Sequence, residues 1–307
     1  MSRRRRGRLI DGILLLDKPA GISSNSAMQR VRILFEARKA GHTGNLDVPA
    51  TGLLPVCLGE ATKITPYLLD ATKSYKARIR LGERTDTGDA AGRLIERLPV
   101  PALTAKKVEA VMEGFVGKIS QVPPMYSALK HQGQRLYRLA ARGETVERKP
   151  REVTIQRLQL LVCEGDILEI EVVCSKGTYI RTLAEDLAVA LRTCGRLETL
   201  RRLQVGPFRL GDAYTLDALT SYREAGSEAL DRLLIPMDRA IVHLPAVSLG
   251  EDSVFYLRRG QAVRVAGAGT GPVRLYDAGQ SFLGVGEMLG DGRVAPRRLL
   301  CHQEAEE

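Results

Sequence analysis

A single carboxylate, Asp47, lies in the segment Gly41 to Gly52, which reads GHTGNLDVPATG. The three glycines of this segment permit close approach of the backbone, and loops of this kind often carry the side chains that act on a substrate. The alternative is an aspartate that serves only as a turn or cap residue. Composition alone favours the turn residue, so the segment marks a candidate site and leaves its chemistry open.

Three other short motifs have spacings that occur in enzymes or ligand sites. Ser127 and Lys130 match the S-x-x-K spacing of serine acyl-transfer enzymes, but the S-D-N and K-T-G motifs that accompany it are absent. The glycines of residues 267–271 lack the spacing of a dinucleotide fingerprint and favour a turn. Asp86 and Asp89 supply too few oxygens for a calcium loop and fit a solvated hairpin tip. An acyl-transfer enzyme built on Ser127 and Lys130 is therefore a minor alternative, and we expect no cofactor.

The cysteines and histidines give no pattern of metal ligands. The five cysteines are scattered and form no C-x-x-C pair, which argues against a disulfide framework and against a thiolate zinc site. The four histidines offer no pair at the ligand spacing of a helix. We therefore expect no metal ion, and a reducing, cytoplasmic compartment.

The net charge points to a polyanionic partner. The chain has 307 residues, with 46 lysines and arginines against 36 aspartates and glutamates, for a formal charge of +10. Such a charge favours RNA, DNA or an anionic membrane surface, although solvated basic faces would also explain it. Apolar residues make up 44% and charged residues 27%, a balance typical of a folded globular protein with one large domain or one large and one small.

Residues 1–8 carry five arginines, and no apolar stretch long enough for a signal peptide or a membrane span follows them. We expect a soluble protein that is not exported. The segment itself is expected to be a basic flexible arm, which either contacts phosphate or simply frays.

The first part of the chain alternates strand and helix patterns. We expect a strand over residues 12–18, a helix that begins near Ser23 to Asn25, an apolar run over residues 53–58, a helix over residues 60–69 and a strand over residues 75–81. On the last strand, Lys76, Arg78 and Arg80 alternate with apolar side chains. One face of that strand is therefore basic and suits an RNA-binding surface.

The later part of the chain has an insertion and a change of character. Residues 121–150 mix prolines and glycines with six lysines and arginines around a short helix at 136–141, which indicates an inserted, mobile, phosphate-contacting lobe or an ordinary solvated loop. We then expect a hairpin over residues 153–162 and 167–174, a helix from Thr178 or a neighbour to Leu191, a strand over residues 200–205, and helices over residues 216–233. After Pro245 helical periods vanish, and short β runs at 262–265, 273–276 and 282–288 indicate a small β-rich domain.

Several blocks together resemble one family. GHTGNLDVPATG resembles the G-H-T-G-x-L-D-P-x-A-T-G signature of the bacterial tRNA pseudouridine synthase B family. Further blocks match that family in the same order: LLDKP at 15–19, YSALK at 126–130, CSKGTYIRT at 174–182, LRR at 200–202 and GRVAPRR at 292–298. The resemblance runs from near the start of the chain to near its end, so chance agreement is negligible.

The resemblance implies an α+β fold. Its central sheet should be mixed and mostly antiparallel, with helices around it and a small C-terminal, β-rich, PUA-like RNA-binding domain. We expect the catalytic domain over residues 9–245, an RNA-gripping insertion around 121–150, and the PUA-like domain over 246–307. The strand patterns and the basic insertion agree with this layout.

The resemblance also implies a reaction, the isomerisation of uridine 55 in the T-loop of tRNA to pseudouridine without a cofactor or a metal. The base is flipped out, the glycosidic bond is cleaved, and the uracil rotates and reattaches through C5. Asp47 matches the family's catalytic aspartate and acts either as a nucleophile at C1′ or as a base at C2′. The expected partner is tRNA, bound through its T-arm and T-loop by a monomer that needs no membrane and no obligate protein partner.

Six further residues match active-site positions of the family. Arg181 is implied to pair with Asp47 and keep it ionised, and Tyr75 to stack on the flipped uracil and assist proton removal from C5. His42 is implied to fill the space left by the flipped nucleotide. The remaining matches are Lys18 as a supporting cation and Tyr179 and Leu200 as pocket walls.

The chain departs from the family signature beside the aspartate. Asn45 stands where a small residue is usual, and Val48 stands where proline directly follows the aspartate, with Pro49 one residue later. The restriction that a proline places on its predecessor therefore falls on Val48 instead of Asp47. We expect activity, and the alternative is a tRNA-binding folding factor that has lost catalysis.

Overall fold

The computed structural model describes residues 7–267 and 269–301. Residues 1–6, which form most of the expected basic arm, lie outside this range. Arg8, the last residue of that arm, is held to the body: its guanidinium pairs with Asp231, and its N–H donates to the Glu36 carbonyl at 2.6 Å. Arg8 therefore belongs to the folded body.

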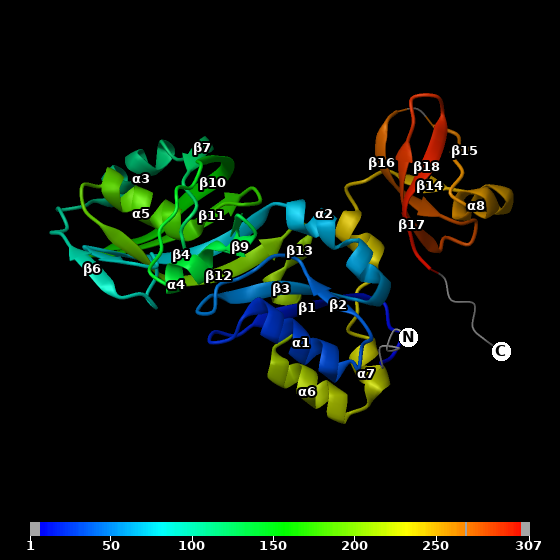
Figure 1. Cartoon of the computed structure of the whole chain (residues 1–307), viewed down its shortest axis with the longest axis horizontal. Helices are drawn as coiled ribbons and strands as arrows, with labels where there is room; N and C mark the ends of the chain where they lie inside the picture. Colours follow the sequence, from blue (N-terminus) through cyan, green and yellow to red (C-terminus); the bar gives the residue numbers. More distant parts are fainter. Residues whose placement is uncertain (1–6, 268, 302–307) are drawn as a thin grey trace.

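A nine-stranded sheet forms the larger of two units (Figure 1). Its main path runs β1-β3-β12-β4-β11-β10-β7, with β2 beside β3 and β13 beside β12. The strands are β1 (Gly12–Lys18), β2 (Ala40–His42), β3 (Thr51–Leu58), β4 (Lys73–Leu81), β7 (Gly117–Gln121), β10 (Arg151–Glu164), β11 (Ile167–Cys174), β12 (Gly195–Val205) and β13 (Phe208–Arg209). Among these strands, β3 and β12 pair in parallel and the other neighbours pair antiparallel. The expected mixed, mostly antiparallel sheet is confirmed.

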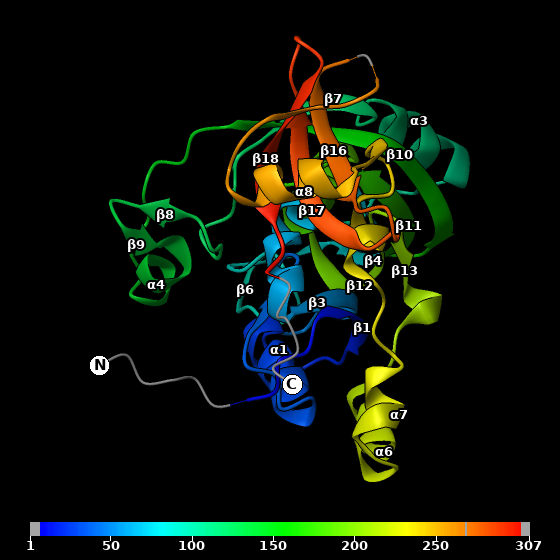
Figure 2. The ribbon, with the colours of Figure 1, turned by 90° about the vertical axis from the view of Figure 1, so that its right-hand side faces the viewer.

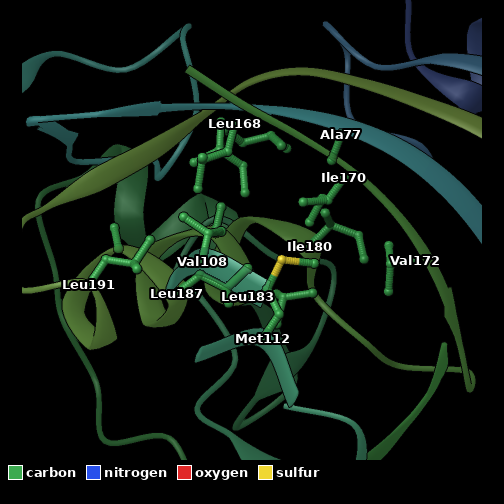
Figure 3. Packing of buried hydrophobic residues seen from close by; sticks show 14 of the residues in the cluster. Ala77, Val108, Met112, Leu168, Ile170, Val172, Ile180, Leu183, Leu187 and Leu191 are labelled. Carbon is green, nitrogen blue, oxygen red and sulfur yellow. The ribbon is translucent and has the colours of Figure 1, made fainter. Parts of the chain in front are cut away.

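Two helices cover one face of the β4–β11–β10 part of the sheet. These are α3 (Ala105–Glu113) and α5 (Ile180–Ala190), and their apolar side chains meet those of the strands in one buried cluster (Figure 3). Val108 and Leu183, for example, lie in the same cluster as Ile170. Because apolar residues alternate along β4, its other face is left for charged side chains.

Both faces of β1 and β3 are buried, which explains their continuous apolar sequences. One face meets α1 (Ser24–Leu34), α6 (Leu216–Glu224) and the segment around α7 (Ser227–Asp231). The other meets η1 (Gly59–Lys63), α2 (Thr65–Asp70) and η3 (Met237–Ile241). A further short 3-10 segment, η2, spans Leu210–Asp212.

Several expected elements differ from the structure in their bounds. The helix expected over 60–69 is two segments, η1 and α2, and Pro66 lies in the first turn of α2, where a helix tolerates proline. The helix expected from Thr178 or a neighbour is α5, and its N-cap is the neighbour Tyr179, while the Thr178 hydroxyl donates to the Ser175 carbonyl at 3.0 Å. The strand expected over 200–205 begins earlier, at Gly195.

The insertion stands away from the sheet on two long connections (Figure 2). It contains β8 (Lys130–His131), β9 (Gln134–Arg135) and α4 (Leu136–Ala141), and α4 has the bounds expected from the sequence. A second small hairpin, β5 (Glu83–Thr85) with β6 (Leu94–Arg97), follows β4.

The basic side chains of β4 are paired with carboxylates. Arg78 contacts Glu169 at 3.0 Å and Glu198 at 2.7 Å, and Arg80 contacts Asp166 at 2.5 Å. Lys76 also contacts Glu169, at 2.9 Å. These cations are largely neutralised by their neighbours, so the face is less suited to binding phosphate than the sequence pattern indicates.

A five-stranded sheet forms the smaller, C-terminal unit, in the order β14-β16-β17-β18-β15. The strands are β14 (Ala246–Ser248), β15 (Val263–Arg264), β16 (Gly271–Tyr276), β17 (Phe282–Met288) and β18 (Arg293–Leu299). The expected β-rich domain is confirmed, but the expected absence of helix is wrong, because α8 spans Glu251–Arg258. Leu257 is the one fully buried residue of α8, so the sequence of this helix lacks a clear periodic pattern of apolar residues.

Within the described part of the chain, no helix combines the length and apolar character needed to cross a membrane.

Candidate active site

The loop that carries Asp47 connects β2 to β3, and hydrogen bonds from α1 and within the loop hold its backbone. Ser24, at the start of α1, accepts the Leu46 N–H at 2.8 Å and donates to the Leu46 carbonyl at 3.2 Å. The Ala50 N–H donates to the Asp47 carbonyl at 3.1 Å, which closes a turn. The carboxylate therefore stands on a loop whose backbone is held on both sides of it.

Arg181 holds that carboxylate from the first turn of α5. Its Nε lies 3.0 Å from Asp47 Oδ2, and its other two nitrogens donate to the carbonyls of Thr87 at 2.8 Å and Tyr126 at 2.7 Å. The Arg181 side chain is 5% exposed and that of Asp47 is 45% exposed. A buried guanidinium with every nitrogen engaged thus presents one carboxylate toward solvent.

Asp89 is a site residue that the sequence interpretation missed. It was expected on a solvated hairpin tip, but it is buried, with its Oδ2 3.8 Å from Arg181 Nε. Its Oδ1 accepts from the Thr87 hydroxyl at 2.7 Å and from the Ala91 N–H at 3.0 Å. The expectation failed because local spacing cannot show that α5 packs against this turn.

Burial and three charged neighbours act on the ionisation of Asp47. Desolvation raises the pKa of its carboxyl, the Arg181 guanidinium lowers it, and the Asp89 carboxylate raises it again. The smallest of these effects is the Lys18 charge, which lowers the pKa of the carboxyl. The net direction is a pKa above the ordinary range for aspartate. Arg181 is therefore the main group that keeps Asp47 ionised.

The other expected pocket residues come from different elements. Leu200, on β12, lines a small pocket together with Asp47 and Asp89. Tyr179 is the N-cap residue of α5, and its backbone N–H donates to the Gln121 side chain at 3.0 Å. Tyr75, on β4, is partly buried against the cluster beneath α5. Burial raises the pKa of both phenols, so both are neutral at physiological pH.

Among the hydrogen bonds and ion pairs of the described residues, neither Lys18 nor His42 is bonded to the Asp47 carboxylate, although the Lys18 charge acts on it. Lys18 is fully buried and donates to the carbonyls of Pro19 and Ile22, each at 2.8 Å, and weakly to that of Val48 at 3.4 Å. Burial lowers the pKa of Lys18 to about 8. His42 ends β2, and burial lowers its pKa, so the imidazole is neutral. Lys18 therefore supports the loop backbone.

No group of three or more metal-ligating side chains occurs within residues 7–267 and 269–301.

Three family models together match most of the chain. "TruB family pseudouridylate synthase (N terminal domain)" matches residues 32–180, "tRNA pseudouridylate synthase B C-terminal domain" matches 181–242, and "Pseudouridine synthase II TruB, C-terminal" matches 245–300. A protein of Nitrosococcus oceani named tRNA pseudouridine synthase B is 53% identical over 303 residues, which cover 98% of each chain. The chain belongs to the tRNA pseudouridine synthase B family.

Further relatives and solved structures agree with this membership. The tRNA pseudouridine synthase B of Stutzerimonas stutzeri is 53% identical over 95% of this chain and 96% of its own. A chain of a Cbf5-Nop10-Gar1 complex has a TM-score of 0.74 and 26% identity, covering 94% of this chain and 84% of its own. A chain from an H/ACA RNP bound to a substrate RNA, at 23% identity and a TM-score of 0.74, shares the fold.

The turn after Asp47 differs from the signature of the tRNA pseudouridine synthase B family. The family's proline would occupy the second position of the turn formed by residues 47–50, where its fixed φ favours a turn. Here Pro49 occupies the third position and Val48, 49% exposed, the second. The hydrogen bond that closes the turn is present, so the loop adopts its fold without the usual proline.

Proposed function

We propose that this chain isomerises uridine 55 in the T-loop of tRNA to pseudouridine, with Asp47 as the catalytic residue and without a cofactor. Relatives that match nearly the whole chain at about half identity bear the name tRNA pseudouridine synthase B. The enzyme acts in the cytoplasm as a monomer on tRNA.

The ion pair between Asp47 and Arg181 is the observation that carries this proposal. An ionised carboxylate with a half-exposed face can reach the ribose of a nucleotide that enters from solvent, while the buried guanidinium fixes its direction. Leu200 and the aromatic rings of Tyr75 and Tyr179 supply apolar and stacking surface for a uracil ring. The uridine must leave its stack to reach this site.

The proposed reaction conserves the composition of the substrate, because the product is an isomer of uridine. The N1–C1′ bond breaks, the detached uracil turns, and a C5–C1′ bond forms; the C5 proton is then lost and N1 gains a proton. Asp47 serves either as the nucleophile that attacks C1′ or as the base that removes the C2′ proton. Either route requires the ionised carboxylate that Arg181 favours, and we assign to the Tyr75 phenol a supporting part in the loss of the C5 proton.

Binding is expected to depend on tRNA shape more than on linear sequence. The positive charge of the chain supplies phosphate contacts, and the insertion around residues 121–150 carries basic side chains on an extended lobe. We assign the grip on the T-arm to this insertion and an additional RNA contact to the PUA-like C-terminal domain.

The test is tritium release from an unmodified tRNA transcript labelled at uracil C5, with wild-type protein and the Asp47→Ala variant. We expect about one equivalent of tritium per tRNA from the wild type and at least a roughly thousandfold lower rate from the variant, with tRNA affinity nearly unchanged. Equally impaired binding in the variant would count against the catalytic role of Asp47.

Two alternatives predict other results. Tight tRNA binding without tritium release from the wild type would identify a non-catalytic folding factor and implicate Asn45 and Val48. Labelling of Ser127 by a fluorophosphonate or β-lactam probe would support an acyl-transfer enzyme. The Ser127 hydroxyl is buried, whereas Lys130 is exposed and forms no hydrogen bond with it in the described residues, so this lysine does not activate the serine.

A further inference from the structure

Arg202, on β12, is a buried cation without a carboxylate partner. It is 1% exposed and ranks first by size among the fully buried side chains. The ion pairs formed within residues 7–267 and 269–301 include its neighbour Arg201, which pairs with Asp17 at 2.7 Å, but not Arg202. Burial of an unpaired cation opposes folding, so its presence here calls for an explanation other than stability.

The guanidinium of Arg202 binds the backbone at both ends of the Asp47 loop. Its Nε donates to the Leu53 carbonyl at 2.7 Å, and its Nη atoms donate to the carbonyls of Asn45 at 3.4 Å and Gly44 at 3.3 Å. The planar fork of an arginine can serve three carbonyls in fixed directions, whereas an ammonium cannot. Arg202 therefore ties the entry of the loop to its exit.

The backbone of Arg202 pairs with the strands on both sides. It is the register partner of Gly52 on β3 and of Tyr75 on β4. The approach to β3 is very close, because a Cβ on Gly52 would lie 2.3 Å from the Arg202 carbonyl oxygen. Directly opposed residues on antiparallel strands have neighbouring side chains, so the Arg202 and Tyr75 side chains share one face of the sheet.

The charge of Arg202 affects the pKa of the Tyr75 phenol and of two other residues around the loop, His42 and Lys18. Burial raises the pKa of Tyr75, and the Arg202 guanidinium acts against that shift, as a hydrogen-bonding cation beside the phenol would. The Cys174 thiol and the Asp47 carboxylate also face this phenol, and both act in the raising direction. The same guanidinium lowers the pKa of His42 and of Lys18, after the larger effect of burial on each.

We propose that Arg202 is a positioning residue of the reaction, which fixes the Asp47 loop relative to the Tyr75 phenol and so couples the carboxylate to the phenol. This inference rests on the roles proposed above for Asp47 and Tyr75. Arg181 orients the carboxylate from the side of α5, and Arg202 sets the position of the loop backbone from the side of β12.

The test compares single-turnover tritium release by the wild type and by Arg202→Met and Arg202→Lys, with Arg201→Met as the matched control. Arg201 is the adjacent arginine of the same strand, and its side chain is 42% exposed, so its loss removes an equal charge from the other face. Each variant is also made with Tyr75→Phe, and tRNA affinity and circular dichroism are measured in parallel.

We expect Arg202→Met to remain folded and to bind tRNA within about threefold of the wild type, while its rate falls by about 100-fold, because small misplacements of reacting groups have effects of this size. Arg202→Lys, which keeps the charge but not the fork, should be intermediate. Arg201→Met should lie within about threefold of the wild type. The double variant Arg202→Met with Tyr75→Phe should be less impaired than the product of the two single losses of rate, since the two side chains act together on the same step.

Other outcomes overturn the proposal. The proposal is contradicted if Arg202→Met and Arg201→Met have equal rates. It is also contradicted if the loss of rate in Arg202→Met parallels a loss of tRNA affinity, or if the losses of rate from Arg202→Met and Tyr75→Phe multiply in the double variant. If Arg202→Met does not fold, the test is made with Arg202→Lys instead. A wild-type rate in Arg202→Lys would show that the planar guanidinium is not required. A wild type that releases no tritium contradicts the proposed function, whereas an active wild type with a fully active Arg202→Met contradicts only this inference.

Discussion

The Arg181 cation and, to a smaller extent, Lys18 favour the ionised form of Asp47, whereas burial and the Asp89 carboxylate oppose it. Burial and Asp89 raise the pKa of the carboxyl, and Arg181 lowers it. Because the pKa of Asp47 in the folded protein lies above its ordinary value, the folded state binds more protons than the unfolded chain in that range. The stability from this group is then present at low pH and is lost as the pH rises. A loss of activity in acid would therefore report protonation of Asp47 and not unfolding caused by it.

Two substitutions should move the acidic limb of the rate profile in opposite directions. Arg181→Gln removes the cation, so the pKa of Asp47 rises and the limb moves to higher pH by about one unit or more. Asp89→Asn removes the neighbouring anion and should move the limb to lower pH, while the amide oxygen can still accept from Thr87 and Ala91. The measurement is the single-turnover rate of tritium release between about pH 4 and pH 8. Shifts in the same direction would contradict this account of the site.

At the scale of elements, the basic side chains of β4 and of the insertion differ in their partners. Arg80 on β4 pairs with Asp166 at 2.5 Å, whereas Arg138 on α4 is exposed and forms no ion pair with the described residues. An arginine already neutralised by a carboxylate gains little from a phosphate, while an unpaired one releases counterions when it binds. The insertion should therefore contribute more to tRNA affinity than the face of β4.

Arg138→Ala should weaken tRNA binding several-fold. The slope of the logarithm of affinity against the logarithm of salt concentration should become shallower by about one. The matched control Arg80→Ala should change the affinity by less than about twofold, because Arg80 is already paired with Asp166 and so contributes little to phosphate binding. Filter binding at several salt concentrations measures both. Equal losses in the two variants would mean that β4 also contacts the RNA.

The elements that could be predicted from the sequence are those with a strong local period. Alternation located β4, and the run of β-forming residues located the β10–β11 hairpin, while the short α8 escaped because it buries little apolar surface. The pairing of Asp47 with Arg181 was expected only from the family resemblance, since no local pattern joins residues so far apart. Asp89 and Arg202 escaped because their roles depend on which elements pack together.

At the scale of the whole molecule, the C-terminal unit packs on the larger one through apolar and polar contacts. Val285 of β17 is fully buried in the same cluster as Ile13 and Leu68 of the larger unit. The Tyr276 hydroxyl donates to Asp238 at 2.9 Å, and the Lys63 ammonium donates to the Leu299 carbonyl at 2.8 Å. These contacts cross between the units, so the stability of each depends in part on the other.

Val285→Ala should therefore reduce hydrogen-exchange protection on both sides of the contact, in β17 and in α2, by an amount of about 1–3 kcal/mol. The matched control is Val273→Ala, because Val273 is equally apolar but lies in the C-terminal unit's own cluster. Its loss should reduce protection in β16 and its neighbours and leave α2 unchanged. Unchanged protection of α2 in Val285→Ala would mean that the two units are energetically independent. The C-terminal unit would then be tethered to the larger one without being oriented by it, and it could not hold a bound tRNA in a fixed direction relative to Asp47.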